Sequence, residues 1–406
     1  MISLIRKEQV DWTLFWFIAL SINLFKFTGF DLKTYQFIHL IIFCYLLWII
    51  ISKRKKKIDS FHYKSILLMI TLPLLSIYSC NVINGQSYFS SLIIFRMHLG
   101  WLVYFYLWNK KLSYQTILQT ILLVGIIYML ITLVQQISYP FAPFGERTLG
   151  SGGDERFGGA VERRMGFYRF AVGGLYYCIL SFFMILASKL RHRKVILLAL
   201  SVGIVASGNR QTIFSIFISV IFYYMFEKQV KNKWLIMLLL ISISGILYVF
   251  SNTIFGRLSN VEEDLESGRM PSYIFYIEKI LQSPLSFWFG NGLPSSSSEY
   301  GQNIDVYGDF RVTPSDIGIV GTAYYWGVLY VGIYLLLMFR WMINKHLSTI
   351  YKAIVLSFIL CCPIASFLFE IEGFLLQGIL FYLCDLDINH NIKYMNYKKN
   401  KTICYQ

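Results

Sequence analysis

Charge is scarce in this sequence, and so are the motifs of soluble enzymes. Only 15% of the 406 residues are charged whereas 56% are hydrophobic, so a single soluble core cannot bury the apolar side chains. The chain has no glycine-rich phosphate loop, no histidine and cysteine spacing typical of a metal site, and no nucleophile elbow. These absences exclude the common nucleotide-binding, zinc and serine-hydrolase classes, and we expect neither a cofactor nor a metal.

Cysteine is missing from the places where a disulfide framework would need it. The seven cysteines lie in or beside apolar segments, and none falls in a long polar segment. The sequence therefore does not predict a disulfide-stabilised fold.

Long apolar runs are what the sequence has in abundance. Runs of about 20 residues, each enough to cross a ~30 Å hydrocarbon layer, recur along almost the whole length. They predict one polytopic, all-α integral membrane domain over residues 1–406 with about twelve transmembrane helices. The expected helices are 12–28, 35–51, 65–83, 91–108, 115–137, 168–187, 195–207, 211–226, 234–251, 315–339, 350–368 and 373–387.

The basic residues set the expected orientation. Despite a net charge of +15, lysine and arginine gather in short connections such as 53–57 and 340–345, which indicates topology and not a nucleic-acid surface. Both termini are then cytoplasmic. Two long loops are left outside: 138–167, rich in glycine and arginine, and 252–313. Within the second we expect an amphipathic helix on the membrane surface at 273–281, followed by a mobile, turn-rich segment at 289–298.

The turn Ser207-Gly208-Asn209-Arg210 carries the leading candidate residue. It joins apolar runs of about thirteen and sixteen residues, which span only roughly 20 to 24 Å as helices. We expect Arg210 to lie below the outer surface, in a pocket lined by protein or water. The alternative is an arginine that snorkels from a helix end to the headgroups.

Further arginines are expected on the outer side, and guanidinium groups suit phosphate because they form two parallel hydrogen bonds. Each loop arginine could instead belong to a solvated surface. For Arg96, inside an apolar run, an ion pair with Glu370 or Glu372 is the alternative, and His98 beside it is expected to be a buried structural histidine. The candidate phosphate-binding residues are Arg96, Arg147, Arg164, Arg169, Arg257, Arg269 and Arg311.

Asp316 is the candidate base. It follows Thr313 and Pro314 at the start of an expected helix, so capping is the alternative to activation of a sugar hydroxyl. Asp309 and Glu155 are further candidates. Asp385-Leu386-Asp387 mimics the acidic pair of nucleotide-sugar transferases, but we expect it on the cytoplasmic side, away from the long loops.

The order and spacing of these motifs resemble the Wzy-type polymerases of lipid-linked sugar repeats, within the O-antigen ligase-like superfamily. The resemblance rests on the 207–210 turn, on Ser267-Gly268-Arg269, on Ser283-Pro284-Leu285 with Gly290-Asn291-Gly292, and on Asp316 to Gly327. Arg147 with Gly158, and Arg257 with Gly268, fit the arginine-to-glycine spacing found in two outer loops of some polymerases. No histidine falls in the longest outer loop, which favours polymerase over ligase.

The resemblance implies a metal-independent glycosyltransferase of the bacterial cytoplasmic membrane, acting at its outer face with donor and acceptor both on undecaprenyl diphosphate. Arg210, Arg169 and Arg269 would neutralise the leaving diphosphate, and Asp316 would deprotonate the acceptor hydroxyl. Partner proteins would be a flippase and a chain-length regulator. A ligase-like transferase, a flippase or transporter, and a non-catalytic assembly partner are the alternative functions.

Overall fold

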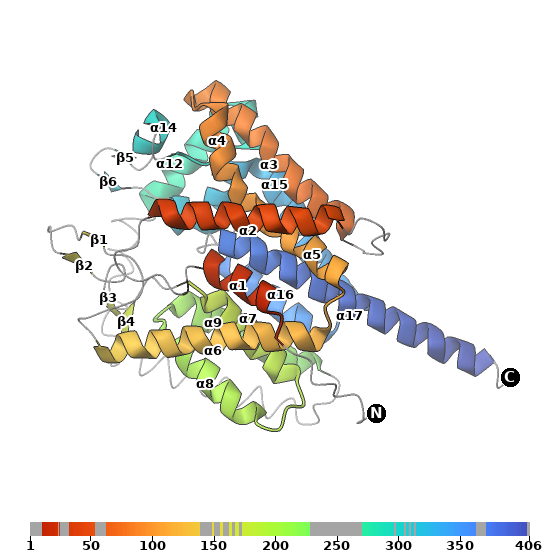
Figure 1. The fold of residues 1–406 in the computed structure, drawn as a ribbon. Coiled ribbons are helices and arrows are strands. Elements are labelled where there is room, and N and C mark those ends of the chain that lie inside the picture. Colours follow the sequence, from red (N-terminus) through yellow and green to blue (C-terminus); the bar gives the residue numbers. More distant parts are fainter. Residues whose placement is uncertain are drawn as a thin grey trace. The chain divides into compact units, whose positions relative to one another are not determined.

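The computed structural model describes residues 10–22, 24, 32–52, 62–138, 148–149, 155–156, 162–164, 167–169, 173–227, 270–295, 298–303, 306–307, 310–311, 314–362 and 371–403. These residues form a helical fold (Figure 1) that divides into two compact units. Unit 1 comprises residues 1–56 and 103–228, and unit 2 comprises residues 57–102 and 229–406.

Unit 1 consists of helices and two short ladders. Its helices are α1 (Trp12–Ser21), α2 (Leu32–Ser52), α5 (Leu102–Lys110), α6 (Tyr114–Ser138), α7 (Leu175–Ala187), α8 (Arg193–Ala206) and α9 (Arg210–Phe226). Its strands pair antiparallel, β1 (Thr148–Leu149) with β2 (Glu155–Arg156) and β3 (Glu162–Arg164) with β4 (Phe167–Arg169).

Unit 2 contains α3 (Tyr63–Asn84), α4 (Tyr88–Phe95), the 3₁₀ helix η1 (Arg96–Trp101), α12 (Met270–Leu281), α13 (Pro284–Phe289), α14 (Glu299–Asn303), the 3₁₀ helix η3 (Pro314–Ile317), α15 (Gly318–Ile343), α16 (Thr349–Cys361) and α17 (Ile371–Ile403). One antiparallel ladder joins β5 (Val306–Tyr307) to β6 (Phe310–Arg311).

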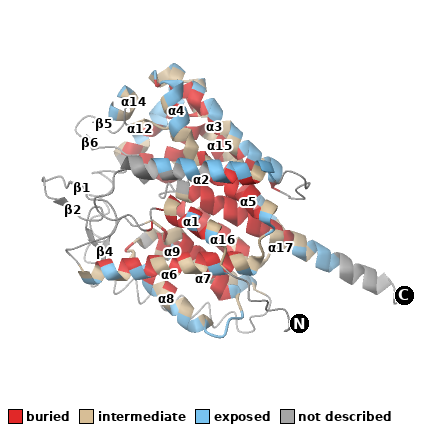
Figure 2. Cartoon of the chain, viewed as in Figure 1, coloured by how far each residue is buried: buried red, intermediate tan, exposed pale blue. Residues whose placement is uncertain are grey.

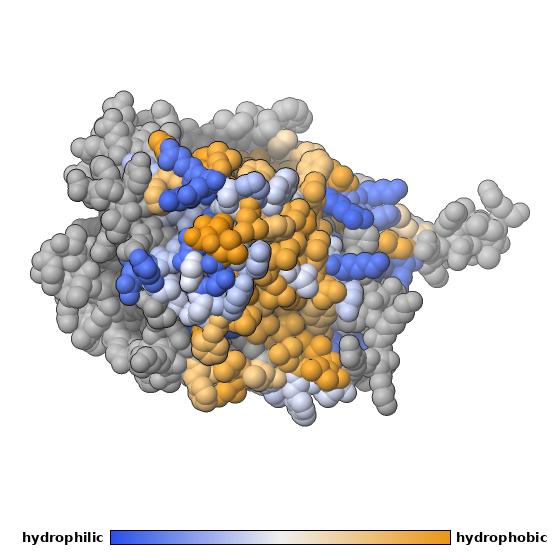
Figure 3. Space-filling view, turned by 90° about the horizontal axis from the view of Figure 1, so that it is seen from above, coloured by the Kyte–Doolittle hydropathy of each residue, from blue (hydrophilic) through white to orange (hydrophobic). Residues whose placement is uncertain are grey.

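Several helices are long and apolar enough to cross a membrane. In the described part of the chain four meet this standard, spanning Tyr63–Asn84, Tyr88–Lys110, Tyr114–Ser138 and Gly318–Ile343. Apolar side chains of α3 and α4, among them Leu67, Leu74 and Phe89, are exposed where a soluble protein would place polar groups. Figure 3 shows a broad apolar area on one face with hydrophilic groups at its edges. The chain is therefore a helical membrane protein.

Small side chains let α6, α7 and α8 pack closely in unit 1. A Cβ on Gly125 would lie 2.8 Å from the Ser181 hydroxyl oxygen, and a Cβ on Gly203 would lie 2.8 Å from Met129. Ser181 donates to the carbonyl of Ile121 at 2.9 Å. Such close approach through small residues is how helices associate when lipid supplies no hydrophobic driving force.

In unit 2 the first half of α17 forms the core. Residues 374–376 and 379–385 are buried, whereas Ile392, Tyr394 and Met395 further along are exposed (Figure 2). Trp101 of η1 packs edge-on against Phe381, with ring centroids 5.4 Å apart. The core of unit 2 therefore joins η1 to α17.

The helices correct several boundaries expected from sequence. The helix expected at 168–187 begins only at Leu175, so Arg169 lies in β4 and not at a helix entrance. The last helix does not end at Asp387 but continues to Ile403, because the basic segment after Asp387 keeps helical residues and no proline or glycine. The helix expected at 234–251 lies outside the described residues, and the number of crossings remains a prediction.

Candidate functional site

The most unusual backbone of unit 2 is a break inside α15. Gly327 has φ 85° and ψ 159°, a conformation that is essentially restricted to glycine. It faces Gly290, which has φ 77° and ψ 179° at the end of α13. A Cβ on Gly327 would collide with the backbone of Trp288 and Phe289, and a Cβ on Gly290 would collide with the backbone of Tyr325 and Gly327. The two glycines therefore interlock.

Backbone hydrogen bonds close this interlock. The N–H groups of Asn291 and Gly292 donate to the carbonyls of Tyr324 and Tyr325, at 2.7 and 2.9 Å. These carbonyls stand just before the break, where regular helical partners are lost, and an unpaired carbonyl at membrane depth is costly. Asn291 also donates through its side-chain nitrogen to the Ser286 hydroxyl at 2.7 Å. The loop thus supplies the hydrogen bonds that the broken helix needs.

Gln86, in the turn between α3 and α4, holds the next part of this loop. Its side-chain nitrogen donates to the Leu293 carbonyl and to the Ser91 hydroxyl, at 3.0 and 2.9 Å. Its side-chain oxygen accepts from the Ser295 N–H and the Ser298 hydroxyl, both at 2.8 Å. Both ends of this buried amide are fully used. Residues 289–295, expected to be a mobile turn-rich segment, are instead packed, because Gln86 and α15 satisfy their backbone groups.

Tyr300 of α14 adds a further contact between this loop and α15. Its hydroxyl lies 3.1 Å from the Gly292 carbonyl oxygen, to which it donates, and 3.0 Å from the Tyr324 hydroxyl. Burial raises the pKa of Tyr300 well above its usual range, so this hydroxyl keeps its proton at physiological pH. The loop is therefore tied to α15 at Asn291 and Gly292 and again at Tyr300.

A second helix is interrupted next to this break. The apolar run Tyr88–Lys110 passes through the 3₁₀ turn η1 instead of one continuous helix. His98 of η1 is fully buried, with its ring centroid 4.2 Å from both Trp326 and Phe374. Within the described residues, neither His98 nitrogen, nor the Trp326 indole nitrogen, nor the Gln377 side-chain amide has a hydrogen-bond partner. The expectation that His98 is buried is confirmed, but within the described residues its ring nitrogens lack the hydrogen bonds that a buried histidine usually makes.

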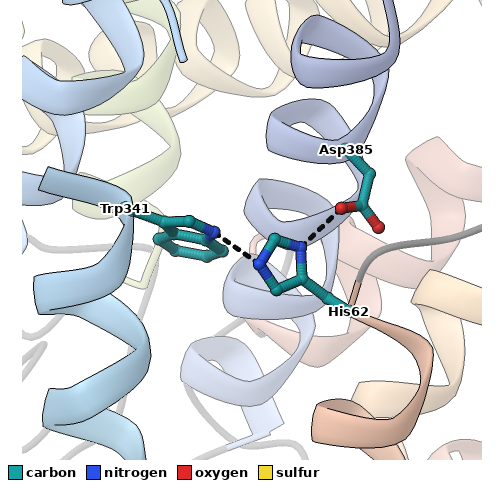
Figure 4. A network of polar contacts seen from close by, with 3 residues as sticks. All are labelled: His62, Trp341 and Asp385. Carbon is teal, nitrogen blue, oxygen red and sulfur yellow. Dashed lines mark hydrogen bonds and ion pairs between the residues drawn. The ribbon is translucent and has the colours of Figure 1, made fainter. Parts of the chain in front are cut away.

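A buried network of three residues lies near the last residues of α15 (Figure 4). The Trp341 indole N–H donates to His62 Nε2 at 2.7 Å, and His62 Nδ1 bonds to the Asp385 carboxylate. Because Nε2 accepts, the ring proton lies on Nδ1, directed at Asp385. The neighbouring Asp387 accepts from the Ser348 N–H at 2.7 Å and from its hydroxyl at 2.8 Å. Asp385 and Asp387, the pair that mimics the acidic motif of nucleotide-sugar transferases, are thus both engaged within the fold.

Arg210 stands where the sequence places it, at a tight turn between two short helices in unit 1. Gly208 has φ 66°, Asn209 accepts from the Thr212 N–H at 3.2 Å as the N-cap, and Arg210 is the first residue of α9. With 14 and 17 residues, α8 and α9 span roughly 21 and 26 Å, short of a ~30 Å layer. The short paired helices are confirmed.

One hydrogen bond shows where this turn lies along α6. Gln136 donates through its side-chain nitrogen to the Ala206 carbonyl at 3.1 Å, and Gln136 is two residues from the end of the 25-residue α6. The turn therefore lies near the end of the longer helix, which favours a site close to the surface of unit 1 over a deeply sunken one.

Arg96 is the one candidate arginine whose side chain is described. It is half-buried and donates to the carbonyl of Ile93 at 2.7 Å, and within the described residues it has no carboxylate partner. The proposed pairing with Glu372 is not seen, and Glu370 lies outside the described residues. A phosphate role for Arg96 stays a prediction.

The other candidate residues are placed only in part. For Arg164, Arg169, Arg311 and Glu155 the structure gives a strand position, and for Asp316 a position in η3, with no side chain described. Pro314 opens η3 while α15 itself begins at Gly318, so the expected helix starts with a 3₁₀ turn. Arg147, Arg257, Arg269 and Asp309 lie outside the described residues. The two units hold different candidates, and convergence of the arginines stays a prediction.

Sequence reasoning missed the interlocked break and the Gln86 contacts. Gly290, Gly292 and Gly327 were all noticed as motif residues, but among 28 glycines nothing marks those that need positive φ. Gln86 carries no sequence signal, since its role depends on loop atoms about two hundred residues away along the chain.

The long apolar helices place the chain among integral membrane proteins of the all-α class. A scan against protein-family models finds no family that matches it, and a search of curated proteins finds no similar sequence. The fold and the site therefore carry the functional reasoning.

Proposed function

We propose that this protein is a polymerase of lipid-linked oligosaccharide repeats, acting at the outer face of the bacterial cytoplasmic membrane. In this proposal about twelve helices cross the bilayer, both termini are cytoplasmic, and the segments 138–167 and 252–313 belong to the outer side of the membrane. The observation that supports it most is a contact between two motifs. Ser283–Leu285 with Gly290–Gly292, and the stretch from Asp316 to Gly327, are the parts of the sequence that resemble polymerases, and they pack against each other in unit 2.

The proposed reaction extends a glycan on its lipid carrier. The hydroxyl oxygen of the acceptor repeat attacks the anomeric carbon of the donor chain, and the bond from that carbon to the diphosphate breaks. The electron pair leaves with undecaprenyl diphosphate, and the hydroxyl proton passes to a carboxylate, for which Asp316 is the candidate. Arg210, Arg169 and Arg269 are the candidates for neutralising the leaving diphosphate.

The geometry at Arg210 is compatible with that role. Its backbone N–H belongs to the first turn of α9, where the helix dipole favours negative charge. Glycine in the left-handed conformation at 208 and the Asn209 cap fix the turn, so the backbone of Arg210 is held at the N-terminus of α9.

The test supplies purified protein in nanodiscs with undecaprenyl-diphosphate repeat units and resolves product length. We expect a ladder of longer lipid-linked glycans from the wild type and a loss of about 10²-fold in rate for Arg210→Ala, since one charged transition-state contact has that weight. Arg193→Ala is the matched control, because Arg193 begins α8 at the other end of the same hairpin and donates to the Ser188 carbonyl.

Two results would oppose the proposal. Equal ladders from wild type and Arg210→Ala would remove the arginine from the reaction. No elongation by the wild type, together with protein-dependent movement of the lipid-linked repeat across a vesicle membrane, would assign a flippase instead.

A further inference from the structure

The α12–α13 hairpin of unit 2 has one apolar face that is packed and another that is not. Tyr276 and Ile280 of α12 are buried, and the Tyr276 ring lies 4.7 Å from that of Tyr324 in α15. On the opposite side, Ile274, Ile277 and Leu281 recur at helical spacing and are 52%, 42% and 64% exposed. Trp288 of α13 is 49% exposed. We call these four exposed side chains the apolar stripe.

The position of the hairpin along its neighbours decides what the apolar stripe meets. The loop after α13 reaches well inside α3, because a Cβ on Gly292 would lie 2.6 Å from the Cys80 Cβ and 3.1 Å from the Ser76 carbonyl oxygen. Cys80 and Ser76 stand four and eight residues before the end of α3, which is roughly 6 to 12 Å along the helix axis.

The contact with α15 gives the same depth. Trp288 and Phe289 touch Gly327, nine residues after the start of α15. If this 26-residue helix is centred in a ~30 Å hydrocarbon layer, Gly327 lies roughly 9 Å inside the boundary. Both α3 and α15 are among the helices long and apolar enough to span a membrane.

We infer that the α12–α13 hairpin is re-entrant, set into the outer half of the membrane against α3 and α15, and that its apolar stripe contacts lipid acyl chains. The inference differs from a helix lying on the membrane surface, which is what the sequence predicts for 273–281. It does not depend on the proposed polymerase activity, because the depth rests on the packing of unit 2 and the outer side on the orientation expected from the basic residues.

The backbone of the hairpin meets the main requirement of such a depth. A non-helical turn within the hydrocarbon layer must find its hydrogen bonds in protein. The Gly290–Gly292 turn does so through the α15 carbonyls, the Asn291 carbonyl accepts from the Asn84 side chain at 3.2 Å, and the Ser286 hydroxyl donates to the Lys279 carbonyl at 2.9 Å. Glu278 and Lys279 are exposed beside the stripe, which fits α12 being nearer the headgroups than α13.

The experiment measures the depth of a fluorophore on the stripe. In a chain whose exposed Cys44, together with Cys404, is replaced by serine, Trp288→Cys is labelled with a nitrobenzoxadiazole probe and reconstituted into phosphatidylcholine and phosphatidylglycerol vesicles. Glu299→Cys, exposed on α14, is the matched control. We expect acyl-chain bromolipids to quench the probe at 288 at least twofold more than at 299, and aqueous iodide to show the reverse order.

Iodide quenching at 288 as strong as at 299 would overturn the inference, since the stripe would then face water. Quenching at 288 by neither agent would also overturn it, because another protein surface would cover the stripe. If Trp288→Cys does not fold, Leu281→Cys carries the same test, as its side chain is 64% exposed. Folding is judged by gel filtration, so loss of glycan polymerisation has no bearing on the result.

Discussion

Gly327→Ala is the sharpest test of the broken helix. Alanine would have to occupy a backbone conformation reserved for glycine, which costs about 1–3 kcal/mol. Its Cβ would also collide with the backbone of Trp288 and Phe289, and overpacking of this kind costs typically about 1–3 kcal/mol. The sum is roughly 4 kcal/mol, a large part of the stability of a typical protein.

Two other glycines of unit 2 separate these contributions. Gly85 has φ 66° and open space around a Cβ, so Gly85→Ala isolates the backbone cost, about 1–2 kcal/mol. Gly332 lies in α15 with open space and no positive φ, so Gly332→Ala should be neutral or gain roughly 0.5–1 kcal/mol from helix propensity.

The assay is thermal unfolding in detergent, followed by tryptophan fluorescence. At roughly 2–4 °C for each kcal/mol in a unit of this size, we expect Gly327→Ala to lower the melting temperature by roughly 8–16 °C. Gly85→Ala should lower it by roughly 2–8 °C, and Gly332→Ala should leave it unchanged or raise it. If Gly327→Ala melts like Gly332→Ala, the interlock between α13 and α15 does not exist.

Three further predictions concern unit 2. Gln86→Ala removes four hydrogen bonds, so we expect the free energy of unfolding to fall by about 2 kcal/mol and proteolytic cleavage near residue 295 to become faster. Gln302→Ala, at an exposed position, is the control and should be cleaved at the wild-type rate. Equal cleavage rates for the two variants would contradict the role of Gln86. Asp385→Ala leaves the buried His62 N–H without its charged acceptor and should cost about 1.5–3 kcal/mol in unfolding experiments. The loss of the neutral indole hydrogen bond in Trp341→Phe should cost about 1 kcal/mol, and the opposite ranking would show that the indole bond dominates the network. His98→Phe replaces a buried ring whose nitrogens have no partner among the described residues, so the free energy of unfolding should fall by no more than about 1 kcal/mol. A much larger loss of stability would reveal a polar partner of His98.

Local signals in the sequence predict the helices well. The apolar runs around α3, α6, α8 and α9 have lengths and flanking charges that fix their ends within a few residues, because lipid exposure demands continuous apolar surface. The turn before Arg210 was also predictable, since Gly208 and Asn209 have the residue types that end one helix and cap the next.

Long-range contacts explain what the sequence could not predict. The helix expected at 315–339 has no proline, and nothing in its composition marks Gly327 as a break. The break is stable only because the Asn291 and Gly292 N–H groups supply its missing hydrogen bonds from outside the helix. The sequence predicts a surface loop at 289–298 because its turn-forming residues are a local signal. The residues that hold this loop, Gln86 and those of α15, are distant along the chain. Among the candidate arginines, the structure gives the side chain of Arg96 and the backbone setting of Arg164, Arg169, Arg210 and Arg311.

The interlock of Gly290 with Gly327 also orders the biogenesis of the protein. The α13 segment leaves the ribosome before α15, and six helical residues are too few to insert into a bilayer on their own. During synthesis this segment must therefore wait outside the membrane until α15 arrives with the carbonyls that receive its turn. The re-entrant hairpin is thus a late product of assembly, and any substitution that delays α15 should leave it exposed to proteases.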